Sequence, residues 1–379
     1  MTSVKTSTKA FEKWLRKKLA DRGGFDKDAL KRKHKAMKKK RRAHQFLRGT
    51  FYRWAERWKD DKAIKISAVG DIHVENFGTW RDAEGRLVWG VNDFDEACTL
   101  PWTSDLVRLG VSAKLALDEE DGFKMPVKKA CRALWKGYEQ AITGKAAPVM
   151  LAEKNDDLGD YARKVVLAKS PDKYWGDELA DLRRIRRPVR KVPEDARDML
   201  KDELPVGAKK LKFFRPKRSK PPGMGSRGKR RFYALATWQG GRILRETKPL
   251  VPSALVWAKG GDPGPGLKAM LKSPSRCPDP FHKTQGKWVV RRLAVDSTKI
   301  ELKDLVPSDK NDKEINGILE KTRPALFKKM GVELGNLHVG SGKSKKLRSQ
   351  LEDRGTGWFY RTVKKWAKKV KKDYHEYRR

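Results

Sequence analysis

Residues 66–106 constrain the fold of this chain more than any other stretch. They hold eight acidic residues against two basic ones, Arg81 and Arg86, in a protein of 379 residues with a formal net charge of +42. The acids are interleaved with Ile, Val, Phe and Trp, which favours burial over a solvated loop. The pattern predicts acidic residues gathered near the ends of short buried strands.

The composition argues against several classes of protein. Hydrophobic residues make up 38% of the chain, including 13 Trp and 13 Phe, which is enough for a packed core. No apolar run approaches the roughly 18 residues of a membrane span, and residues 1–20 lack the apolar block of a secretory signal. The three cysteines are far apart and show no CxxC spacing, as expected for a reducing compartment. We therefore expect a cytoplasmic protein without a membrane span.

Hydrophobic spacing predicts a mixed α+β protein. Apolar residues spaced by three, four and seven positions predict one long helix from about Leu30 to Trp58. A further helix is expected after Pro101, with Ser104 as a candidate N-cap. The other expected helices lie within residues 124–200, at 312–339 and at 356–373. Strands are expected at residues 63–69 and 87–92, joined by a turn near 83–85, at 288–295, and in a hairpin formed by 229–238 and 242–248.

Shifts in composition divide the chain into four predicted parts, with a Pro/Gly/basic stretch at 205–229 as the clearest boundary. They are a basic helical segment (1–60), a helical lobe with the acidic motifs (61–204), a β-rich lobe (205–300) and C-terminal helices (301–379).

The first candidate site combines two acidic motifs. Asp71 and Asn76 have the D-x-x-x-x-N spacing of a kinase catalytic loop, in which a carboxylate orients the attacking hydroxyl and an amide oxygen reaches a metal. Asp93 and Asp95 follow a hydrophobic strand, where a magnesium-binding carboxylate would lie. We expect Asp71 as the catalytic carboxylate and Asn76 and Asp93 as metal ligands. Asp95 is either a second ligand or an orienting neighbour.

Each of these residues also has a structural interpretation. Asp and Asn are common in turns and at helix caps, so all four could serve only the backbone. His73 is a candidate catalytic-site residue beside Asp71, where it would position the catalytic loop. A satisfied structural histidine is favoured over a catalytic base, because Asp71 already fills that role. Asp105, just inside the expected helix, is predicted to make a buried hydrogen-bonded contact.

The second candidate site is a G-x-G-x-x-G sequence at Gly223, Gly225 and Gly228. A strand rather than a helix is expected after it, and a glycine loop between strands is the kinase arrangement for covering nucleotide phosphates. Lys248 ends the next strand and could reach the α- and β-phosphates. The alternatives are a flexible linker for the glycines and an ordinary surface position for Lys248.

Several segments resemble an uncharacterised bacterial family, domain of unknown function 2252 (DUF2252). They are FLRGT (46–50), GDIHVENFG (70–78), NDFDEA (92–97), PWTSDLVRL (101–109), GMGSRG (223–228) and ELGNLHVGSG (333–342). The GDxHxxN and DFD motifs in turn look like those of aminoglycoside and choline phosphotransferases, which have a protein-kinase-like fold. That likeness implies a catalytic Asp71, magnesium ligands Asn76 and Asp93, and a structural carboxylate at Asp105.

The order of the motifs is inverted relative to kinases, because Asp71 precedes Gly223, and Lys248 is followed by Pro249-Leu250 where family members have Glu-Ala. We therefore expect a circularly permuted kinase-like fold, with a mainly helical lobe and a small antiparallel sheet lobe. The expected activity is Mg-ATP-dependent phosphoryl transfer to an unidentified hydroxyl-bearing or polyanionic acceptor, with ATP and Mg²⁺ as cofactors.

Two alternatives stay open at the level of sequence. One is a nucleotide-binding pseudokinase without turnover. The other is a nucleic-acid-binding protein whose basic helices follow phosphate nonspecifically, with Trp54, Trp58 and Trp366 available for stacking on bases or buried as core residues.

Overall fold

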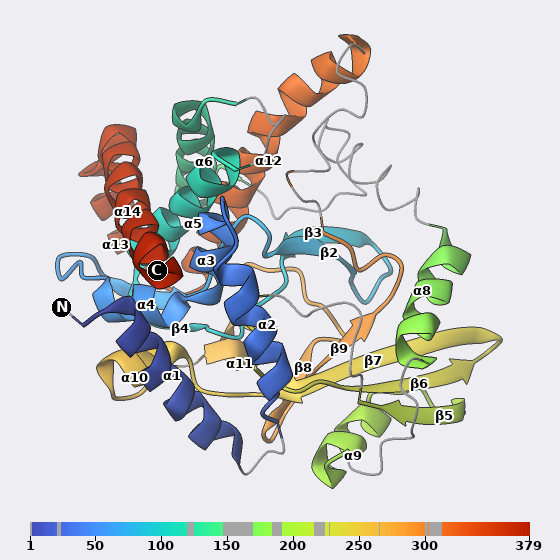
Figure 1. The fold of residues 1–379 in the computed structure, drawn as a ribbon. Coiled ribbons are helices and arrows are strands. Elements are labelled where there is room, and N and C mark those ends of the chain that lie inside the picture. The colour runs from blue at the N-terminus through green and yellow to red at the C-terminus, as the bar shows by residue number, and fades with distance from the viewer. Residues whose placement is uncertain are drawn as a thin grey trace.

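A computed structural model describes residues 2–20, 24–119, 125–146, 170–183, 192–215, 224–226, 228–264, 266–299, 302 and 313–379. Helices and small antiparallel sheets are mixed in it, which confirms the α+β class (Figure 1). Gly223, one of the predicted glycines, lies outside the described residues.

The N-terminal region forms four helices, α1 (Val4–Leu19), α2 (Lys27–Met37), α3 (Ala43–Gly49) and α4 (Phe51–Arg57). The single long helix predicted from Leu30 to Trp58 is therefore wrong. The chain leaves helical geometry at Arg41, which has a φ of 50°, and again at Thr50, which has a φ of −132°. These two breaks let α2, α3 and α4 each turn an apolar side toward a different neighbour.

Two short antiparallel pairs carry the acidic stretch. Strand β1 (Lys65–Ala68) pairs with β4 (Cys98–Pro101), and β2 (Phe77–Arg81) pairs with β3 (Leu87–Val91). The strands expected at 63–69 and 87–92 are confirmed, but they are not partners of each other. The loop that follows β1 ends before Phe77, because Phe77–Arg81 is a largely buried strand.

A five-stranded antiparallel sheet forms the second layer, in the order β5-β6-β7-β9-β8. Its strands are β5 (Lys209–Phe214), β6 (Phe232–Trp238), β7 (Gly241–Pro249), β8 (Lys283–Gln285) and β9 (Trp288–Leu293). The expected hairpin is confirmed as β6 and β7, with Gln239 and Gly240 at positive φ in its turn. Strand β5 lies inside the Pro/Gly/basic stretch.

The remaining helices confirm most of the helical predictions. They are α5 (Trp102–Leu117), α6 (Val127–Ile142), α8 (Pro171–Arg183), α9 (Glu194–Asp202), α10 (Ala254–Lys259), α11 (Gly266–Leu271), α12 (Lys313–Val339), α13 (Ser344–Glu352) and α14 (Gly355–Arg378). The N-cap predicted at Ser104 is wrong, because Pro101 precedes the helix and Ser104 lies inside it. There the Ser104 hydroxyl accepts a 3.0 Å hydrogen bond from the Trp54 indole.

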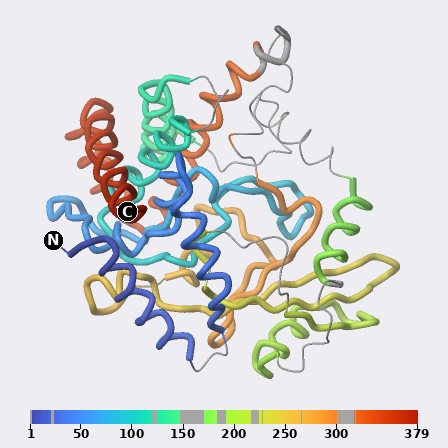
Figure 2. The backbone as a smooth tube through the Cα atoms, viewed as in Figure 1, coloured from blue at the N-terminus to red at the C-terminus, as the bar shows by residue number. Residues whose placement is uncertain are grey.

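The hydrophobic core has two parts. The larger one joins the N-terminal helices, β1 to β4, α5, α6 and the C-terminal helices. The smaller one lies between α9 and the five-stranded sheet, around Met199, Phe232 and Trp288. The site described below lies where the acidic loops of the larger part meet the segment that leads into β6. Figure 2 shows the red C-terminal helix of this larger part close to the blue N-terminal helices.

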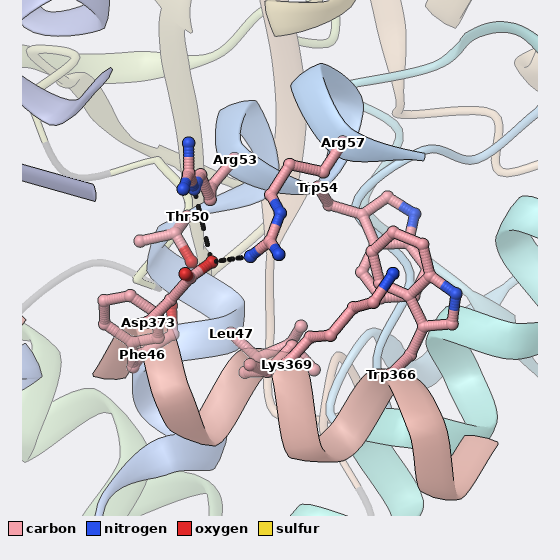
Figure 3. Close-up of a pocket in the computed structure, with 10 residues that line it drawn as sticks. Phe46, Leu47, Thr50, Arg53, Trp54, Arg57, Trp366, Lys369 and Asp373 are labelled. Carbon is pink, nitrogen blue, oxygen red and sulfur yellow. Dashed lines mark hydrogen bonds and ion pairs between the residues drawn. The ribbon is translucent and has the colours of Figure 1, made fainter. Parts of the chain in front are cut away.

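The first and last helices lie side by side. The Val4 amide donates a 3.0 Å hydrogen bond to Glu376, and Asp373 of α14 accepts from both Arg53 and Arg57 of α4 (Figure 3). Trp54 and Trp58 pack against Trp366 with ring centroids 4.7 and 4.8 Å away. The core interpretation of these three tryptophans is therefore confirmed. No helix among the described residues is long and apolar enough to cross a membrane.

Candidate active site

A fully buried carboxylate fixes the loop that follows β1. Asp105 of α5 accepts hydrogen bonds from the amides of Val69, at 2.6 Å, and Gly70, at 3.1 Å, so its predicted buried contact is confirmed. Gly70 has a φ of +79°, and a Cβ at this position would lie 2.2 Å from the Glu96 carbonyl oxygen. The backbone therefore turns sharply at Gly70 and presents the next residue, Asp71, to the interior.

Within this loop, Asn76 and His73 hold the backbone. The Asn76 side-chain oxygen accepts a 2.9 Å hydrogen bond from the His73 amide, and His73 Nδ1 accepts one from the Glu75 amide at 3.2 Å. Burial, together with the charge of Arg48, keeps the pKa of His73 well below its usual value, so the ring is neutral with its proton on Nε2. The geometry gives His73 a loop-positioning contact.

Asp71 lies at the centre of the site. Its Oδ1 accepts a hydrogen bond from Arg108, a fully buried guanidinium that also donates to the Leu47 carbonyl at 2.9 Å. Burial raises the pKa of Asp71 to about 7, although Arg108 opposes the rise, and the nearby charges of Glu96 and Asp93 add to it. A carboxylate with this pKa can take up and release a proton near neutral pH.

The loop after β3 presents two aspartates with different partners. Asp93 accepts a 3.3 Å hydrogen bond from the Asp95 amide and forms no ion pair with any residue that the structure describes. Asp95 bridges two buried lysines, with Lys248 at 2.7 Å and Lys229 at 3.4 Å. Burial alone would raise the pKa of Asp95, but the two lysines outweigh it and hold the pKa well below its usual range.

The described residues of the glycine segment, 224–226 and 228, include one that closely approaches the loop after β1. A Cβ on Gly225 would lie 2.7 Å from Asp71 Oδ2, so only glycine permits this approach without a shift. Gly228 faces away from the cavity, and its carbonyl accepts a 2.8 Å hydrogen bond from the Asp26 amide ahead of α2. The adjacent Lys229 pairs with Phe25 in an isolated β-bridge. Gly228 and Lys229 are therefore joined to the segment ahead of α2, while Gly225 lies next to Asp71.

These elements enclose a small cavity of about 10 Å³. Its lining comes from both acidic loops and from the glycine segment: Asp71, Asn76, Asp93, Asp95, Glu96, Gly225 and Ser226. The volume suits one ion or one water molecule. The structure thus brings together the predicted Asp71, Asn76, Asp93, Asp95 and Gly225, with Lys248 behind Asp95.

The donor set of the cavity differs from that of a metal site built from protein ligands alone. In the described part of the chain, no group of three or more His, Cys, Asp or Glu side chains is arranged to hold a metal ion. Asp93 and the Asn76 amide oxygen supply two oxygen donors, which fits Mg²⁺, since this ion commonly takes one or two protein ligands together with substrate phosphates and water.

Sequence reasoning missed two cations of the site, Arg108 and Lys229. Both had a local signal: Arg108 lies one helical turn after Asp105 in the PWTSDLVRL segment, and Lys229 directly follows the last glycine. In a chain with 90 Lys and Arg, that signal does not distinguish a buried cation from a surface one.

Residues 25–172 match the model of a family described as an uncharacterized protein conserved in bacteria (DUF2252). The match supports the resemblance to this family. It includes both acidic motifs and Arg108 but ends before the glycine segment and Lys248, and it covers less than half of the chain. No curated protein and no solved structure matches this chain.

Proposed function

We propose that this protein is an Mg-ATP-dependent phosphotransferase with a kinase-like site that acts on a hydroxyl-bearing acceptor. The observation that carries the proposal is the meeting of Gly225 with Asp71, Asn76 and Asp93 around one cavity. About 130 residues of chain separate Asp93 from Gly225. In kinases the same residue types serve the catalytic carboxylate, the metal ligands and the phosphate-covering loop.

The roles of the residues follow from their contacts. Asp71 orients the acceptor hydroxyl and takes up its proton, while Arg108 holds the Asp71 carboxylate in place. Asn76 and Asp93 hold the magnesium ion, which when bound neutralises charge on the nucleotide phosphates. Asp95 has both oxygens engaged by lysines, so within this proposal it positions Lys248 and Lys229 for phosphate and is not itself a ligand.

A circular permutation accounts for the inverted order of the motifs. The catalytic loop precedes the glycine segment in the chain, yet the two lie in contact. The first and last helices also lie side by side, through Val4 and Glu376, and such proximity is what permutation requires. We therefore propose a permuted kinase-like arrangement in which the five-stranded sheet covers the nucleotide.

The cavity is too small for a nucleotide in this conformation. It offers about 10 Å³, whereas small-molecule sites span roughly 300–1,000 Å³. Nucleotide entry therefore requires the segment around Gly225 to move away from Asp71, as glycine-rich loops do in other phosphotransferases.

A paired thermal-shift experiment tests the proposal. With Mg-ATP at about one hundred times its Kd, the native protein gains about 2.7 kcal/mol, and we expect its Tm to rise by several degrees. Asp93→Ala should lose most of this rise, and so should the native protein with ATP and EDTA. Asp61→Ala removes an exposed carboxylate outside the site and should keep the full rise.

Turnover then separates an enzyme from a pseudokinase. Asp71→Asn should retain the Mg-ATP shift and lose ATP consumption, because it keeps the shape of the carboxyl group without its basicity. A native protein that shows no shift with any nucleotide and magnesium contradicts the proposal. One that binds Mg-ATP but consumes it no faster than Asp71→Asn is a pseudokinase.

A further inference from the structure

Two basic runs that lie more than 300 residues apart in the sequence are neighbours in the fold. The first, residues 31–42, holds nine Lys and Arg and covers α2 and the turn after it, and the second occupies α14. The Tyr374 hydroxyl donates to the Lys39 carbonyl and accepts from the Arg42 amide at 3.1 Å. Arg378 donates to the Lys38 carbonyl at 3.0 Å. The C-terminal half of α14 is thereby held against the turn at 38–42.

Many cations of both runs project into solvent, although Lys33 of the first run is buried. Residues 38–42 are all exposed, and α14 presents exposed cations at Arg361, Lys364, Lys365, Lys368 and Lys372. Their spacing of three and four places these five on one side of the helix, opposite the buried residues Val363, Trp366 and Val370. We call residues 38–42 and these five side chains the basic face.

Acidic residues near the basic face are engaged elsewhere. Asp373 is turned inward onto Arg53 and Arg57, as Figure 3 shows, and Glu376 accepts from the Val4 amide. Asp118 pairs with Lys114 and with Lys371, and Lys371 is not part of the basic face. The five α14 cations of the basic face form no ion pair with a described residue, so their charge is available to an anionic partner.

The face is rich in cations and poor in accessible rings, with half-buried Tyr360 beside Lys364. Trp366 is buried against Trp54 and Trp58, so it cannot stack on an unpaired base. The exposed large hydrophobic residues among those described, Val206 and Trp238, lie in or beside the five-stranded sheet, so none is available here to enter a bilayer. A partner of this face is therefore recognised mainly by its phosphates, and its bases need not be accessible.

We propose that the basic face binds the backbone of double-stranded DNA without reading its sequence. The α14 cations of the basic face, from Arg361 to Lys372, extend about 17 Å along the helix axis, enough to follow phosphates over roughly half of the 34 Å turn of B-DNA. The major groove of B-DNA is wide enough to admit a helix, whereas that of an RNA duplex is narrow and deep. The observations that carry this inference are independent of the phosphotransferase site.

The test measures binding of the full chain to a fluorescent DNA duplex of about 24 base pairs at several salt concentrations. Lys364, Lys365, Lys368 and Lys372 are changed together to Gln. The matched control changes four exposed lysines elsewhere, Lys209, Lys212, Lys268 and Lys287, so both variants lose the same charge. Circular dichroism and thermal melting verify that both variants fold.

We expect the α14 variant to bind duplex DNA at least about tenfold more weakly near physiological salt and the control variant to change little. The slope of log K against log salt should fall by about three to four in the α14 variant, since each phosphate contact contributes about 0.9. Single-stranded DNA and duplex RNA of equal length should bind the native protein more weakly than duplex DNA.

Four outcomes overturn the inference. An equal loss in the two variants makes binding a property of total charge and not of this face. Tighter binding to single strands, or to duplex RNA, assigns the face to another nucleic acid. If the α14 variant loses binding to vesicles containing phosphatidylserine and keeps its binding to duplex DNA, the face is a membrane-binding surface.

Discussion

Asp71 is subject to two opposing influences on its proton. Burial favours the neutral acid, whereas Arg108 favours the carboxylate, and the balance brings the pKa of Asp71 to about 7. A carboxyl group with an ordinary pKa would be a weak base at neutral pH. The buried position therefore gives Asp71 the basicity that the proposed proton transfer needs.

The raised pKa of Asp71 predicts a pH-dependent rate. Since the ionised form is the active one, kcat/KM should increase about tenfold per pH unit below pH 7 and level off above it. Arg108→Met removes the charge that lowers the pKa, so the midpoint should move to higher pH. Arg108→Lys keeps the charge and should return it toward the native value. A native profile that is flat from pH 5 to 8 would show that Asp71 is not the titrating base.

At single positions, the sequence predicts the acids of the site better than the cations. The two acids Asp71 and Asp93, with the amide Asn76 between them, could be predicted to lie together because they are close in the chain and fall in an acidic stretch of a basic protein. Lys229 and Arg108 could not, because their burial depends on long-range packing and not on neighbouring residues. The contacts of Asp95 with Lys248 and Lys229 were not predictable for the same reason.

At the level of elements, α5 supports the catalytic loop through Asp105. The carboxylate accepts from two consecutive backbone amides, and His338 of α12, itself 2.8 Å from the Tyr138 hydroxyl, lies 3.3 Å from Asp105 Oδ2. Three helices thus contribute to one fully buried hydrogen-bonded chain beneath the loop. These hydrogen bonds hold the backbone at Gly70 in the conformation that presents Asp71.

Removing Asp105 should therefore cost stability. Asp105→Ala leaves two buried backbone donors without an acceptor, at about 1–3 kcal/mol each, so we expect the free energy of unfolding to fall by roughly 2–5 kcal/mol. Urea denaturation followed by circular dichroism measures the change. Asp61→Ala, at an exposed carboxylate, should stay within about 0.5 kcal/mol. A loss no larger than that of the control would mean that other groups hold the loop.

Element boundaries were less predictable than element types. Residues 30–58 carry a helical spacing throughout, but spacing alone does not tell one helix from three whose apolar sides face different partners. The partner of β1 was not predictable either. Any of the next strands could pair with so short a strand, and tertiary packing decides that β4 does so while β2 pairs with β3. The β6–β7 hairpin was predictable since its turn sequence acts locally.

At the scale of the whole molecule, opposite charges are separated in space. The acids of the cavity are half-buried, and two of them, Asp71 and Asp95, are paired with buried cations, whereas the basic face lies on the surface formed by α14 and the turn after α2. Helix α2 belongs to both regions. It starts at Asp26, which is hydrogen-bonded to Gly228 of the glycine segment, and ends at the turn that is held against α14. The net charge of +42 therefore indicates neither where the acids gather nor where the basic face lies.

The attachment of α14 depends on a buried ion pair that links the two ends of the chain. Asp373 lies 3.2 Å from Arg53 and 2.5 Å from Arg57, and all three side chains are largely buried (Figure 3). Asp373→Asn leaves Arg57 without its counter-charge and Arg53 with Glu56 as its remaining carboxylate partner. We expect a loss of about 3 kcal/mol, because the desolvation cost of the arginines is then no longer offset.

Denaturation and hydrogen exchange together test this coupling. In Asp373→Asn, amides of α14 should exchange faster than in the native protein, while those of the β6–β7 hairpin change little. Asp118→Asn is the matched control, since Asp118 forms more exposed pairs with Lys114 and Lys371 and its loss should cost less than about 1 kcal/mol. If both variants lose equal stability and α14 exchanges as in the native protein, apolar packing around Trp366 holds the helix and the ion pair does not.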